Sequence, residues 1–539
     1  MKYVMLLLIS CSMPFFAQAQ WNYPSYDALK KQFNTLSSHS SVEMASIGKS
    51  YGGEEIPMLK IQKDKLSRPT LLIVAGVDGR HPAGVLQSLR IVQEIVGKPQ
   101  GELESLLSEK SIWVIPVLNP DAYKRNINSG RWHAGNGRAI DNDRDGRLDE
   151  DPDVDLNKDG VISQMRVKSP AGQYKVHPLH PSVLVQADRS KGESGQYELF
   201  MEGMDTDHDG QYGEDPSAGV NIDRNFTFDY PFFESETGDY AASEPETRAF
   251  MDLLFDQPQV AAVLHLGMQN NLSVAEPFDQ RKASERIVKS WSKNDVQVAA
   301  MVSKLYNDAV KSQGEAPKLP AGKGNLSTTA YYHAGKFSFV TPGWWIPANS
   351  DTSKNVQRVP NGKELDRLVN WVNNKGVQGA VLPWTKIDHP DFPGQEVEVG
   401  GVVSAFLNNP PIDHLEGPAK LHTEFVLQLA KSLATLEFST PKVTALGDDI
   451  HRIEIRLYNT GAMPTYPEIA DRIKHVSKMK AILDMQKNQS FLSGKRLQLY
   501  PALQPGDALS LSWLVKGKGT VKLTVGCPTA GEKTVDIKL

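Results

Sequence analysis

Three side chains that can bind a transition metal follow apolar strands in this sequence. Asp78 and His81 come shortly after the apolar run 70–75, and His265 closes the run that begins at Val260. Catalytic zinc takes three nitrogen or oxygen ligands from the protein and keeps a fourth position for water. In open α/β sheets such sites lie at the ends of strands. Asp78, His81 and His265 therefore predict a zinc site, although a lone histidine at a strand end is usually structural.

Strands and helices alternate around these residues. From Trp21 to about Leu433 the sequence shows apolar runs separated by amphipathic segments, which is an α/β pattern. Strands are predicted over residues 70–75, 112–118, 260–266 and 337–341. One helix is predicted over 83–96, and another begins at Ser243, where Ser-Glu-Pro-Glu reads as a capping box with Ser243 as the cap.

The pattern changes after Phe438. The runs 453–457 and 520–525 alternate apolar and polar residues, and turn residues separate such runs. This alternation predicts a β-sandwich of about 100 residues, the size of one immunoglobulin-like module. We expect this part to be accessory or stabilising rather than catalytic.

The length and composition indicate a globular protein of two domains. The 539 residues are too many for one ordinary domain, and 40% hydrophobic with 23% charged residues is a globular composition. A formal charge of −5 gives no basic footprint for nucleic acid. No later stretch is apolar enough to span a membrane.

The N-terminus predicts a signal peptide at residues 1–19. Lys2 precedes an apolar region, and Ala17-Gln-Ala19 is a small-x-small cleavage site. A lipoprotein cleaved at Cys11 is the alternative, but it would leave only a stub of the apolar region. The mature chain would hold only Cys527, so no intrachain disulfide can form, as suits a secreted or periplasmic bacterial protein stabilised by its core. We therefore predict an α/β domain at 20–435 and a β-sandwich at 436–539.

An acidic insert at about 133–218 contains an internal repeat. Asp-x-Asp-x-Asp-Gly occurs at 141–146 and again at 205–210, and Asp-x-Asn-x-Asp-Gly lies between them. Oxygen ligands on alternate residues before a glycine suit a Ca²⁺ loop, although none of the three carries the glutamate of a true EF-hand. The predicted structural calcium ligands are Asp141, Asp143, Asp145, Asp155, Asn157, Asp159, Asp205, Asp207 and Asp209. The alternative is a solvated acidic loop.

Seven segments, in order, resemble the zinc carboxypeptidases, the carboxypeptidase A/B-type metalloexopeptidases. They are Ile47-Gly-Lys-Ser-Tyr-Gly-Gly, Ala75-Gly-Val-Asp-Gly-Arg-His, Asn119-Pro-Asp-Ala-Tyr, Gly219-Val-Asn-Ile-Asp-Arg-Asn-Phe, Ser243-Glu-Pro-Glu-Thr, His265-Leu-Gly-Met-Gln and Tyr332-His-Ala-Gly-Lys-Phe-Ser-Phe-Val-Thr-Pro. The resemblance covers most of residues 21–411, and the acidic insert is similar to that of a secreted bacterial branch. It implies a mixed sheet flanked by helices, zinc, and a peptide ligand with a free carboxylate.

The resemblance also assigns roles, and several positions depart from the family pattern. Asp78 stands in the place of the first histidine ligand and His81 in the place of the glutamate ligand. Asp223 replaces an asparagine that binds the substrate carboxylate, beside Arg224, which is kept. An ionised Asp223 would repel that carboxylate, or it could neutralise Arg224.

Three further roles bear on catalysis. Tyr332 has the position of the substrate-capping tyrosine, with an ordinary core tyrosine as the alternative. Arg131 and Arg138 are the candidates for the arginine that stabilises the oxyanion. Pro342 replaces the catalytic glutamate, and proline cannot transfer protons, so the loss of general acid–base help of about 10²- to 10⁴-fold is expected to leave weak or no peptidase activity.

Three functions remain open at this point. The first is a secreted metallocarboxypeptidase with unusual ligands, in which Glu276 or His333 supplies a substitute base. The second is a pseudopeptidase that grips peptides or other anionic ligands with Arg224 and Tyr332 without cleaving them. The third is a hydrolase that uses the Asp/His/His site on a different bond. The Trp344-Trp345 pair is expected in the core, with ligand contact as the alternative.

Overall fold

The computed structural model describes residues 21–127, 129–140, 148, 153–206, 208, 210–213, 219–347 and 363–539. The predicted signal peptide and the predicted calcium ligands Asp141, Asp143, Asp145, Asp207 and Asp209 lie outside these residues. The chain separates into two compact units. The smaller is built from the described residues within 151–214 and 353–406, together with Trp21 and Asn22, and the larger from the remainder.

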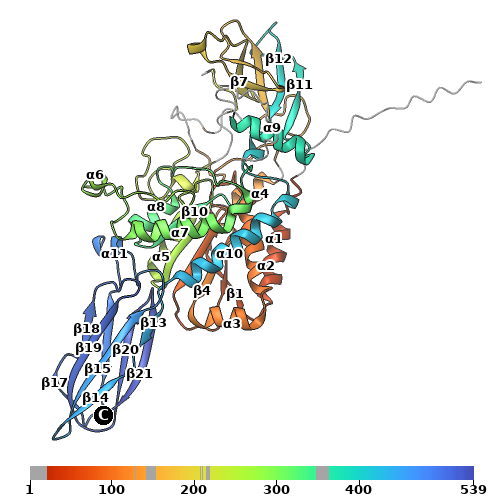
Figure 1. Cartoon of the computed structure of the whole chain (residues 1–539). Coiled ribbons are helices and arrows are strands. Elements are labelled where there is room, and N and C mark those ends of the chain that lie inside the picture. The colour runs from red at the N-terminus through yellow and green to blue at the C-terminus, as the bar shows by residue number, and fades with distance from the viewer. Residues whose placement is uncertain are drawn as a thin grey trace, which may run out of the picture. The chain divides into compact units, whose positions relative to one another are not determined.

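A mixed sheet forms the centre of the larger unit (Figure 1). Its strands, in spatial order, are β1 (Val42–Lys49), β2 (Glu55–Ile61), β4 (Ser111–Ile115), β3 (Thr70–Ala75), β9 (Val260–Leu266) and β10 (Phe337–Thr341). The strands from β4 to β10 run parallel to one another, whereas β1 and β2 pair antiparallel. Every residue of β3, β9 and β10 is buried, as expected for parallel strands covered on both faces. The four strands predicted from the sequence are confirmed, with β4 ending before the predicted boundary.

Helices accompany this sheet, and most of them pack on it, whereas α6 (Gln280–Ala283) lies in a loop away from it (Figure 1). The others are α1 (Tyr26–Ser37), α2 (Pro82–Val96), α3 (Gln100–Glu109), α4 (Pro120–Asn126), α5 (Pro245–Asp256), α7 (Asp295–Val310), α8 (Leu326–Tyr332) and α10 (Glu416–Ser432). The proline at the first position of α2 suits a helix start, because its missing N–H would have no partner there. Helix α2 packs against α10 and against β3 and β9. His81, the N-cap of α2, is thereby held at the carboxyl end of the sheet.

The predicted capping box at Ser243 is wrong. Helix α5 begins at Pro245, its N-cap is Glu244, and no side chain caps it. The hydroxyl of Ser243 donates to Glu244 Oε1 at 2.7 Å, and Glu246 Oε1 accepts from the backbone of Tyr51 at 2.9 Å. The polar side chains that resemble a cap therefore bind other segments, and the proline sets the helix start instead.

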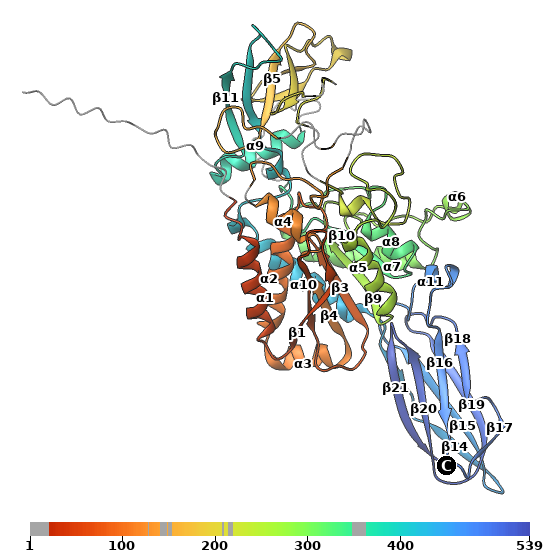
Figure 2. The same ribbon diagram turned by 180° about the vertical axis from the view of Figure 1, so that it is seen from behind.

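The smaller unit is a six-stranded antiparallel sheet with one helix (Figure 2). Its strands, in spatial order, are β11 (Val381–Ile387), β12 (Val397–Val402), β5 (Gln164–Lys168), β8 (Tyr197–Met201), β6 (Tyr174–His177) and β7 (His180–Gln186), and its helix is α9 (Lys363–Lys375). Strand β7 at one edge also contacts β11 and β12 at the other edge, so the sheet curls round on itself. Residues 363–406 thus complete the fold of the acidic insert, a partnership that the sequence analysis did not predict.

The C-terminal strands form two antiparallel sheets. One holds β13 (Leu436–Phe438), β15 (Ile450–Asn459), β19 (Ala508–Lys516) and β17 (Ser490–Ser493), with β14 (Lys442–Gly447) paired to β15. The other holds β18 (Leu497–Tyr500), β16 (Met479–Asp484), β20 (Thr520–Cys527) and β21 (Gly531–Lys538). Alternate residues of both sheets enclose one hydrophobic core that includes Trp513 and Cys527. A short helix, α11 (Glu468–Arg472), follows β15.

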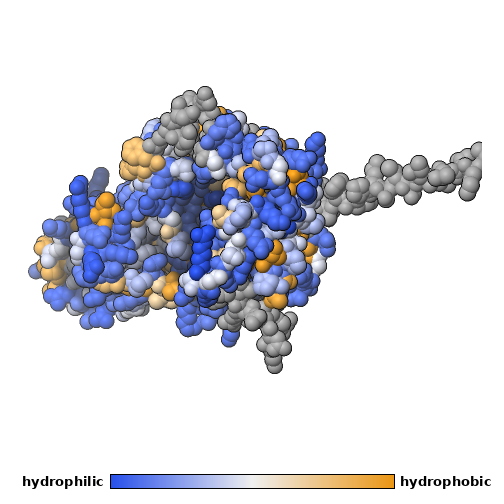
Figure 3. All heavy atoms as spheres, turned by 90° about the horizontal axis from the view of Figure 1, so that it is seen from above, coloured by the Kyte–Doolittle hydropathy of each residue, from blue (hydrophilic) through white to orange (hydrophobic). Residues whose placement is uncertain are grey.

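The surface agrees with the globular composition. The face in Figure 3 is mainly hydrophilic, with apolar residues scattered over it. Within the described ranges, no helix is both long and apolar enough to cross a lipid bilayer.

Candidate functional site

The carboxyl ends of three parallel strands bring the predicted zinc ligands to one edge of the sheet. His265 on β9 lies in register with Val74 on β3 and with Val340 on β10. Asp78 and His81 follow β3, and Pro342 follows β10. This edge is where ligand sites of open α/β sheets lie.

The carboxylate of Asp78 is occupied by the guanidinium of Arg80. Arg80 Nε donates to Oδ1 at 3.0 Å and Nη2 donates to Oδ2 at 2.7 Å, and the backbone N–H of Arg80 also donates to Oδ1. Asn221 Nδ2 lies 3.2 Å from Oδ2. Burial raises the pKa of Asp78, but the charge and hydrogen bonds of Arg80 outweigh this and hold the pKa below its usual range. Asp78 is therefore ionised and already neutralised by its neighbour.

The imidazoles of His81 and His265 are buried without hydrogen bonds of normal geometry at any of their four ring nitrogens. Burial lowers the pKa of His81 to about 4, although Asp78 and the carbonyl groups of Leu266 and Pro342 act in the opposite direction. Burial, and next the neighbouring His81, lowers the pKa of His265 to about 3. Both rings are neutral at pH 7, which is the form that binds a metal.

Zinc fits these three residues only in part. The unpartnered imidazole nitrogens suit a metal, but the carboxylate that would complete the set is bound by Arg80 on both oxygens. In the described part of the chain, Asp78, His81 and His265 do not form a group whose ligand atoms all lie within 4.8 Å of one another. As it stands, this arrangement is not a complete three-ligand zinc site.

Asp223 lies beside the same edge and does not bind Arg224. Its Oδ1 accepts from the backbone of Leu326 at 3.0 Å and its Oδ2 accepts from Gln269 Nε2 at 2.8 Å. Burial is the main cause that raises the pKa of Asp223 to about 7, and the charge of Asp78 adds to it. Near neutral pH this carboxyl is therefore partly protonated.

The predicted substrate arginines have other partners. Arg224 Nη2 lies 2.5 Å from Glu234 Oε2, so its partner is Glu234 and not Asp223. Arg138 pairs with Glu244 Oε1 at 2.7 Å and also with Asp239. These three carboxylates compete with any carboxylate ligand for the two guanidiniums. The carbonyl group of Arg131 accepts from the hydroxyl of Ser129.

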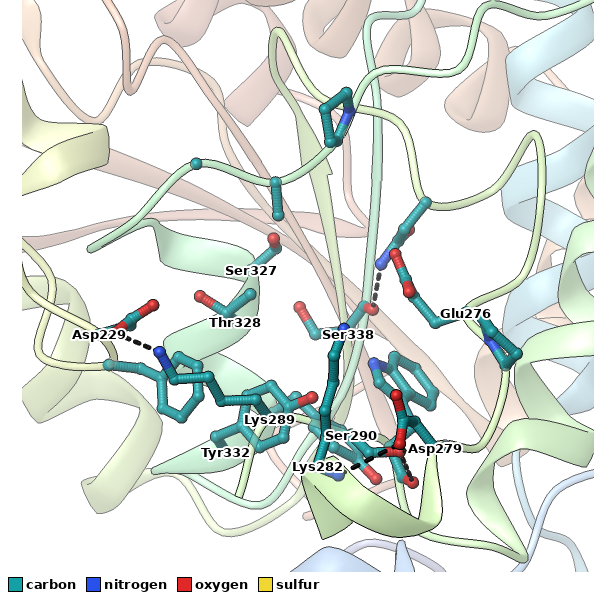
Figure 4. Close-up of a pocket in the computed structure, with 18 residues that line it drawn as sticks. Asp229, Glu276, Asp279, Lys282, Lys289, Ser290, Ser327, Thr328, Tyr332 and Ser338 are labelled. Carbon is teal, nitrogen blue, oxygen red and sulfur yellow. Dashed lines mark hydrogen bonds and ion pairs between the residues drawn. The ribbon is translucent and has the colours of Figure 1, made fainter. Parts of the chain in front are cut away.

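Tyr332 lies in a pocket of about 300 Å³ (Figure 4). Its ring stacks on Phe228 with centroids 4.2 Å apart, and only 8% of the residue is exposed. Glu276 and the basic residues Lys282 and Lys289 also line the pocket. Lys289 is 2.8 Å from Asp229, while Glu276 projects from the opposite wall in the view. The pocket thus offers an aromatic wall and charges of both signs.

The substitute bases predicted from the sequence contact residues other than the predicted zinc ligands. Glu276 lines the pocket, and His333 Nδ1 lies 2.8 Å from the hydroxyl of Thr227. The Trp344-Trp345 pair is buried, 4% and 6% exposed, which confirms the core prediction. Pro342 and Gly343 are buried at the end of β10, where Gly343 lies close to the buried side chain of Gln87.

The segments that begin at Ile47, Asn119 and Ser243 bind one another. Asp121 Oδ1 accepts from the hydroxyl of Ser50 at 3.0 Å and its Oδ2 from the backbone of Gly52 at 2.7 Å. Glu246 accepts from Tyr51, as noted, and burial raises its pKa to about 7. The segments around residues 50, 121 and 246 are therefore structural supports for the sheet edge, and their presence says little about catalysis.

Two of the predicted calcium loops fall partly within the described residues. Gly160 N donates to Asp155 Oδ2 at 2.8 Å, and Gly210 N donates to Asp205 Oδ2 at 3.1 Å, so the repeats share one hydrogen bond. Asp159 N donates to Oδ1 of Asp155 and to Oδ1 of Asn157. Oδ1 of Asp205 is buried without a hydrogen-bond partner.

Sequence reasoning missed two residues that decide the chemistry of the edge. Arg80 stands two residues after Asp78, and an arginine this close to a buried carboxylate was a readable signal for an ion pair. Glu234 gave no signal, because it lies ten residues from Arg224 in a loop without a pattern.

The comparisons with known proteins point to one family. A family model described as zinc carboxypeptidase matches residues 30–170, and a domain of unknown function matches 435–538. The chain is 25% identical to a zinc carboxypeptidase of Saccharothrix mutabilis subsp. capreolus over 126 residues, which is 22% of this chain and 29% of that protein. It is 29% identical to carboxypeptidase B of Astacus astacus over 105 residues, which is 19% of this chain and 34% of that protein. The matches thus span about a third of these relatives.

Solved structures give looser likenesses. Thrombin-activatable fibrinolysis inhibitor is 14% identical, with 78% of each chain covered and a TM-score of 0.40. Carboxypeptidase A of Helicoverpa armigera is 15% identical, with 78% of this chain and 76% of that chain covered and a TM-score of 0.39. Residues 30–170 of this chain, which include strands β1 to β4 and the predicted ligands Asp78 and His81, are thus similar to the zinc carboxypeptidase family.

Proposed function

We propose that this chain is an exported ligand-binding protein on a zinc carboxypeptidase scaffold, a pseudopeptidase that holds peptides or similar carboxylate-bearing ligands without efficient hydrolysis. The observation that carries the proposal is the ion pair between Arg80 and the buried Asp78. It neutralises the one carboxylate of the predicted metal set. Pro342 supports the same conclusion, because no proton can be passed from that position.

The pocket beside Tyr332 is the proposed binding site. Tyr332 and Phe228 provide an apolar wall, and the ammonium group of Lys282 supplies positive charge for a carboxylate, whereas Lys289 is paired with Asp229. In small-ligand sites a few charged or polar groups fix the orientation of the ligand, and the charged residues of this pocket can do the same.

A second candidate is a metal-dependent carboxypeptidase, favoured by the buried, unpartnered imidazoles of His81 and His265. In this case zinc would bind Asp78, His81 and His265 and polarise the scissile carbonyl. Arg80 would have to release Asp78, and Glu276 or His333 would have to replace the missing base. We derive no further step from this candidate, because Asp78 is not available in the observed geometry.

The division of the chain is part of the proposal. A cleaved signal peptide at 1–19, a carboxypeptidase-like domain at 20–435 and a β-sandwich accessory domain at 436–539 remain our proposed organisation, supported by the family match that begins at residue 435. Structural calcium at the Asp155 and Asp205 loops is likewise proposed, supported by the shared hydrogen bond and the unpartnered Oδ1 of Asp205.

The test combines hydrolysis and binding. A mixed peptide library is incubated with the full mature protein, with added zinc or with chelator, and C-terminal loss is read by mass spectrometry. Binding of peptides with free or amidated C-termini is measured in parallel by calorimetry. We expect intact peptides, and tighter binding of the free acids.

Matched variants show where a ligand sits. Lys282→Ala in the pocket should weaken binding of the free acids several-fold. Lys304→Ala, an exposed lysine on α7 that pairs with Asp308, should leave binding unchanged. Chelator-sensitive removal of C-terminal residues would reject the pseudopeptidase and favour the second candidate.

A further inference from the structure

A different group of metal-binding side chains lies in the smaller unit. In the part of the chain that the structure describes, His177, His180 and Asp366 form a group of three whose ligand atoms all lie within 4.8 Å of one another. They share no residue with the edge of the large sheet and none with the acidic repeats.

The two histidines belong to one tight hairpin. His177 ends β6 and His180 begins β7, so only two residues separate them, and they pair in register across the hairpin. Their rings stack with centroids 4.9 Å apart and an angle of 23° between planes. The two imidazoles thus face the same space.

The third side chain comes from a distant segment. Asp366 lies in the first turn of α9, and its Oδ1 is 2.7 Å from His177 Nε2. The side chain of His177 is fully buried and that of Asp366 is 10% exposed. Despite their closeness, neither His177 Nε2 nor Asp366 Oδ1 has a hydrogen bond of acceptable geometry. Two buried polar atoms are therefore left unsatisfied at the centre of the group, where each would normally need a partner.

We propose that His177, His180 and Asp366 bind one divalent transition metal ion of the zinc class. Two imidazoles and one carboxylate are a common zinc ligand set, and water would fill the fourth position. The ion would satisfy both unpartnered atoms at once. It would also join the β6–β7 hairpin to α9, two segments almost two hundred residues apart in sequence, and so hold the smaller unit together.

Metal binding requires two local changes. Zinc ligands at about 2.0–2.2 Å from the ion lie roughly 3.4 Å apart in a tetrahedron, so the Nε2–Oδ1 pair must open. His177 Nδ1 now accepts from the backbone N–H of Leu179 at 3.1 Å. When Nε2 binds the metal, the ring proton resides on Nδ1 and the hairpin turn gives up this hydrogen bond. Both changes are local, because they involve only the His177–Asp366 pair and the hairpin turn at Leu179.

The competing interpretation is a plain buried ion pair between His177 and Asp366. The variant Asp366→Asn distinguishes this ion pair from a metal site. The asparagine oxygen can still accept a hydrogen bond from His177 Nε2–H, so a hydrogen-bonded pair would survive. It is a poor zinc ligand, so a metal site would not. His180→Ala removes a ligand that the ion pair does not need, and this position is only half-buried.

The experiment uses the full mature protein, stripped with chelator and then titrated with zinc alone. Bound zinc per chain is counted by elemental analysis, and cobalt replaces zinc for absorption spectra. We expect His180→Ala and Asp366→Asn each to bind one zinc fewer than the wild type and to lose a cobalt band. They should also lose the zinc-induced rise in unfolding temperature of this unit. His451→Ala, a half-buried histidine on β15, is the matched control and should bind as the wild type does.

The zinc count separates this site from the one at the sheet edge. His265→Ala removes a ligand of that edge, so zinc that remains bound to this variant must lie elsewhere. If the double variant His265→Ala/His180→Ala no longer binds this zinc, the zinc belongs to the new site. Equal zinc counts and equal cobalt spectra in wild type, His180→Ala and Asp366→Asn would overturn the proposal. A His265→Ala protein that is folded by circular dichroism but binds no zinc would overturn it as well.

Discussion

Arg80 holds Asp78 through two parallel hydrogen bonds, at 3.0 Å and 2.7 Å, at the edge where a zinc carboxypeptidase would place its metal. A planar guanidinium matches both oxygens of a carboxylate, so this pairing is specific as well as strong. The pair makes a metal unnecessary for the charge balance of Asp78. The proposal of a ligand-binding protein without efficient hydrolysis rests on this pair.

Arg80→Ala should expose this relationship. The buried Asp78 would lose its counter-charge, so we expect the free energy of unfolding, measured in chelator, to fall by about 1–3 kcal/mol. The loss is moderate because the side chain of Arg80 is 45% exposed and is partly screened by solvent. Saturating zinc should then raise the unfolding temperature more than it does in the wild type, since Asp78 becomes free to bind metal. Arg224→Ala, whose partner Glu234 is partly exposed, is the control and should change little. An identical zinc response in Arg80→Ala and wild type would show that Arg80 does not block the site.

Asp223→Asn should change the pH dependence of stability. The folded pKa of Asp223, about 7, lies above its ordinary value of 3.8, mainly because of burial. Its contribution to stability is therefore full below about pH 4 and is lost as the pH rises through 7. Asparagine stays neutral, so the advantage of Asp223→Asn over the wild type should grow from pH 4 to pH 8, to at most about 4 kcal/mol. Gln269 can turn its unpartnered Oε1 toward the new amide.

Denaturant unfolding at pH 4, 6 and 8 measures this difference. Asp308→Asn, an exposed carboxyl on α7, controls for the general effect of charge. A difference between Asp223→Asn and wild type that stays constant over the range would mean that Asp223 is ionised throughout.

Asp295 should link the C-terminal strands to the pocket. Its Oδ1 accepts from Glu468 N at 2.8 Å and its Oδ2 from Ile469 N at 3.1 Å, so it caps α11, and the hydroxyl of Tyr331 donates to Oδ2 at 2.8 Å. Tyr331 stacks on Trp291, and both rings line the pocket. We expect Asp295→Ala to cost about 1–3 kcal/mol through the lost cap and hydrogen bonds, and to weaken binding of free-acid peptides.

The tryptophan emission spectrum and calorimetry measure the effect of Asp295→Ala. Lys304→Ala, an exposed position on the same helix, serves as the control. If Asp295→Ala lowers the stability but leaves peptide affinity unchanged, α11 supports the fold without shaping the pocket.

The sequence predicts the frame of this site better than its chemistry. Strands β3, β9 and β10 are visible as apolar runs because parallel strands are buried on both faces, and the place of Asp78 and His265 follows from the ends of those runs. The partners of the charged groups are not visible. Glu234 binds Arg224 and Gln269 binds Asp223 through loop conformations that no periodicity encodes. Asp366 reaches His177 from a segment 189 residues away, which only the folded sheet brings close.

Removal of calcium should destabilise the chain if the acidic repeats bind it. In the presence of a zinc-selective chelator, added calcium should raise the unfolding temperature, because an ion present at about a hundred times its dissociation constant adds roughly 2.7 kcal/mol to the folded state. Asp155→Ala should lose part of this rise, since its carboxylate organises the loop through the backbone of Asp159 and Gly160. Asp188→Ala, a half-buried carboxyl of the same unit that pairs with Lys191, is the control and should keep the full rise. If calcium produces no rise in the wild type, the repeats are solvated loops whose carboxylates only cap their own backbone.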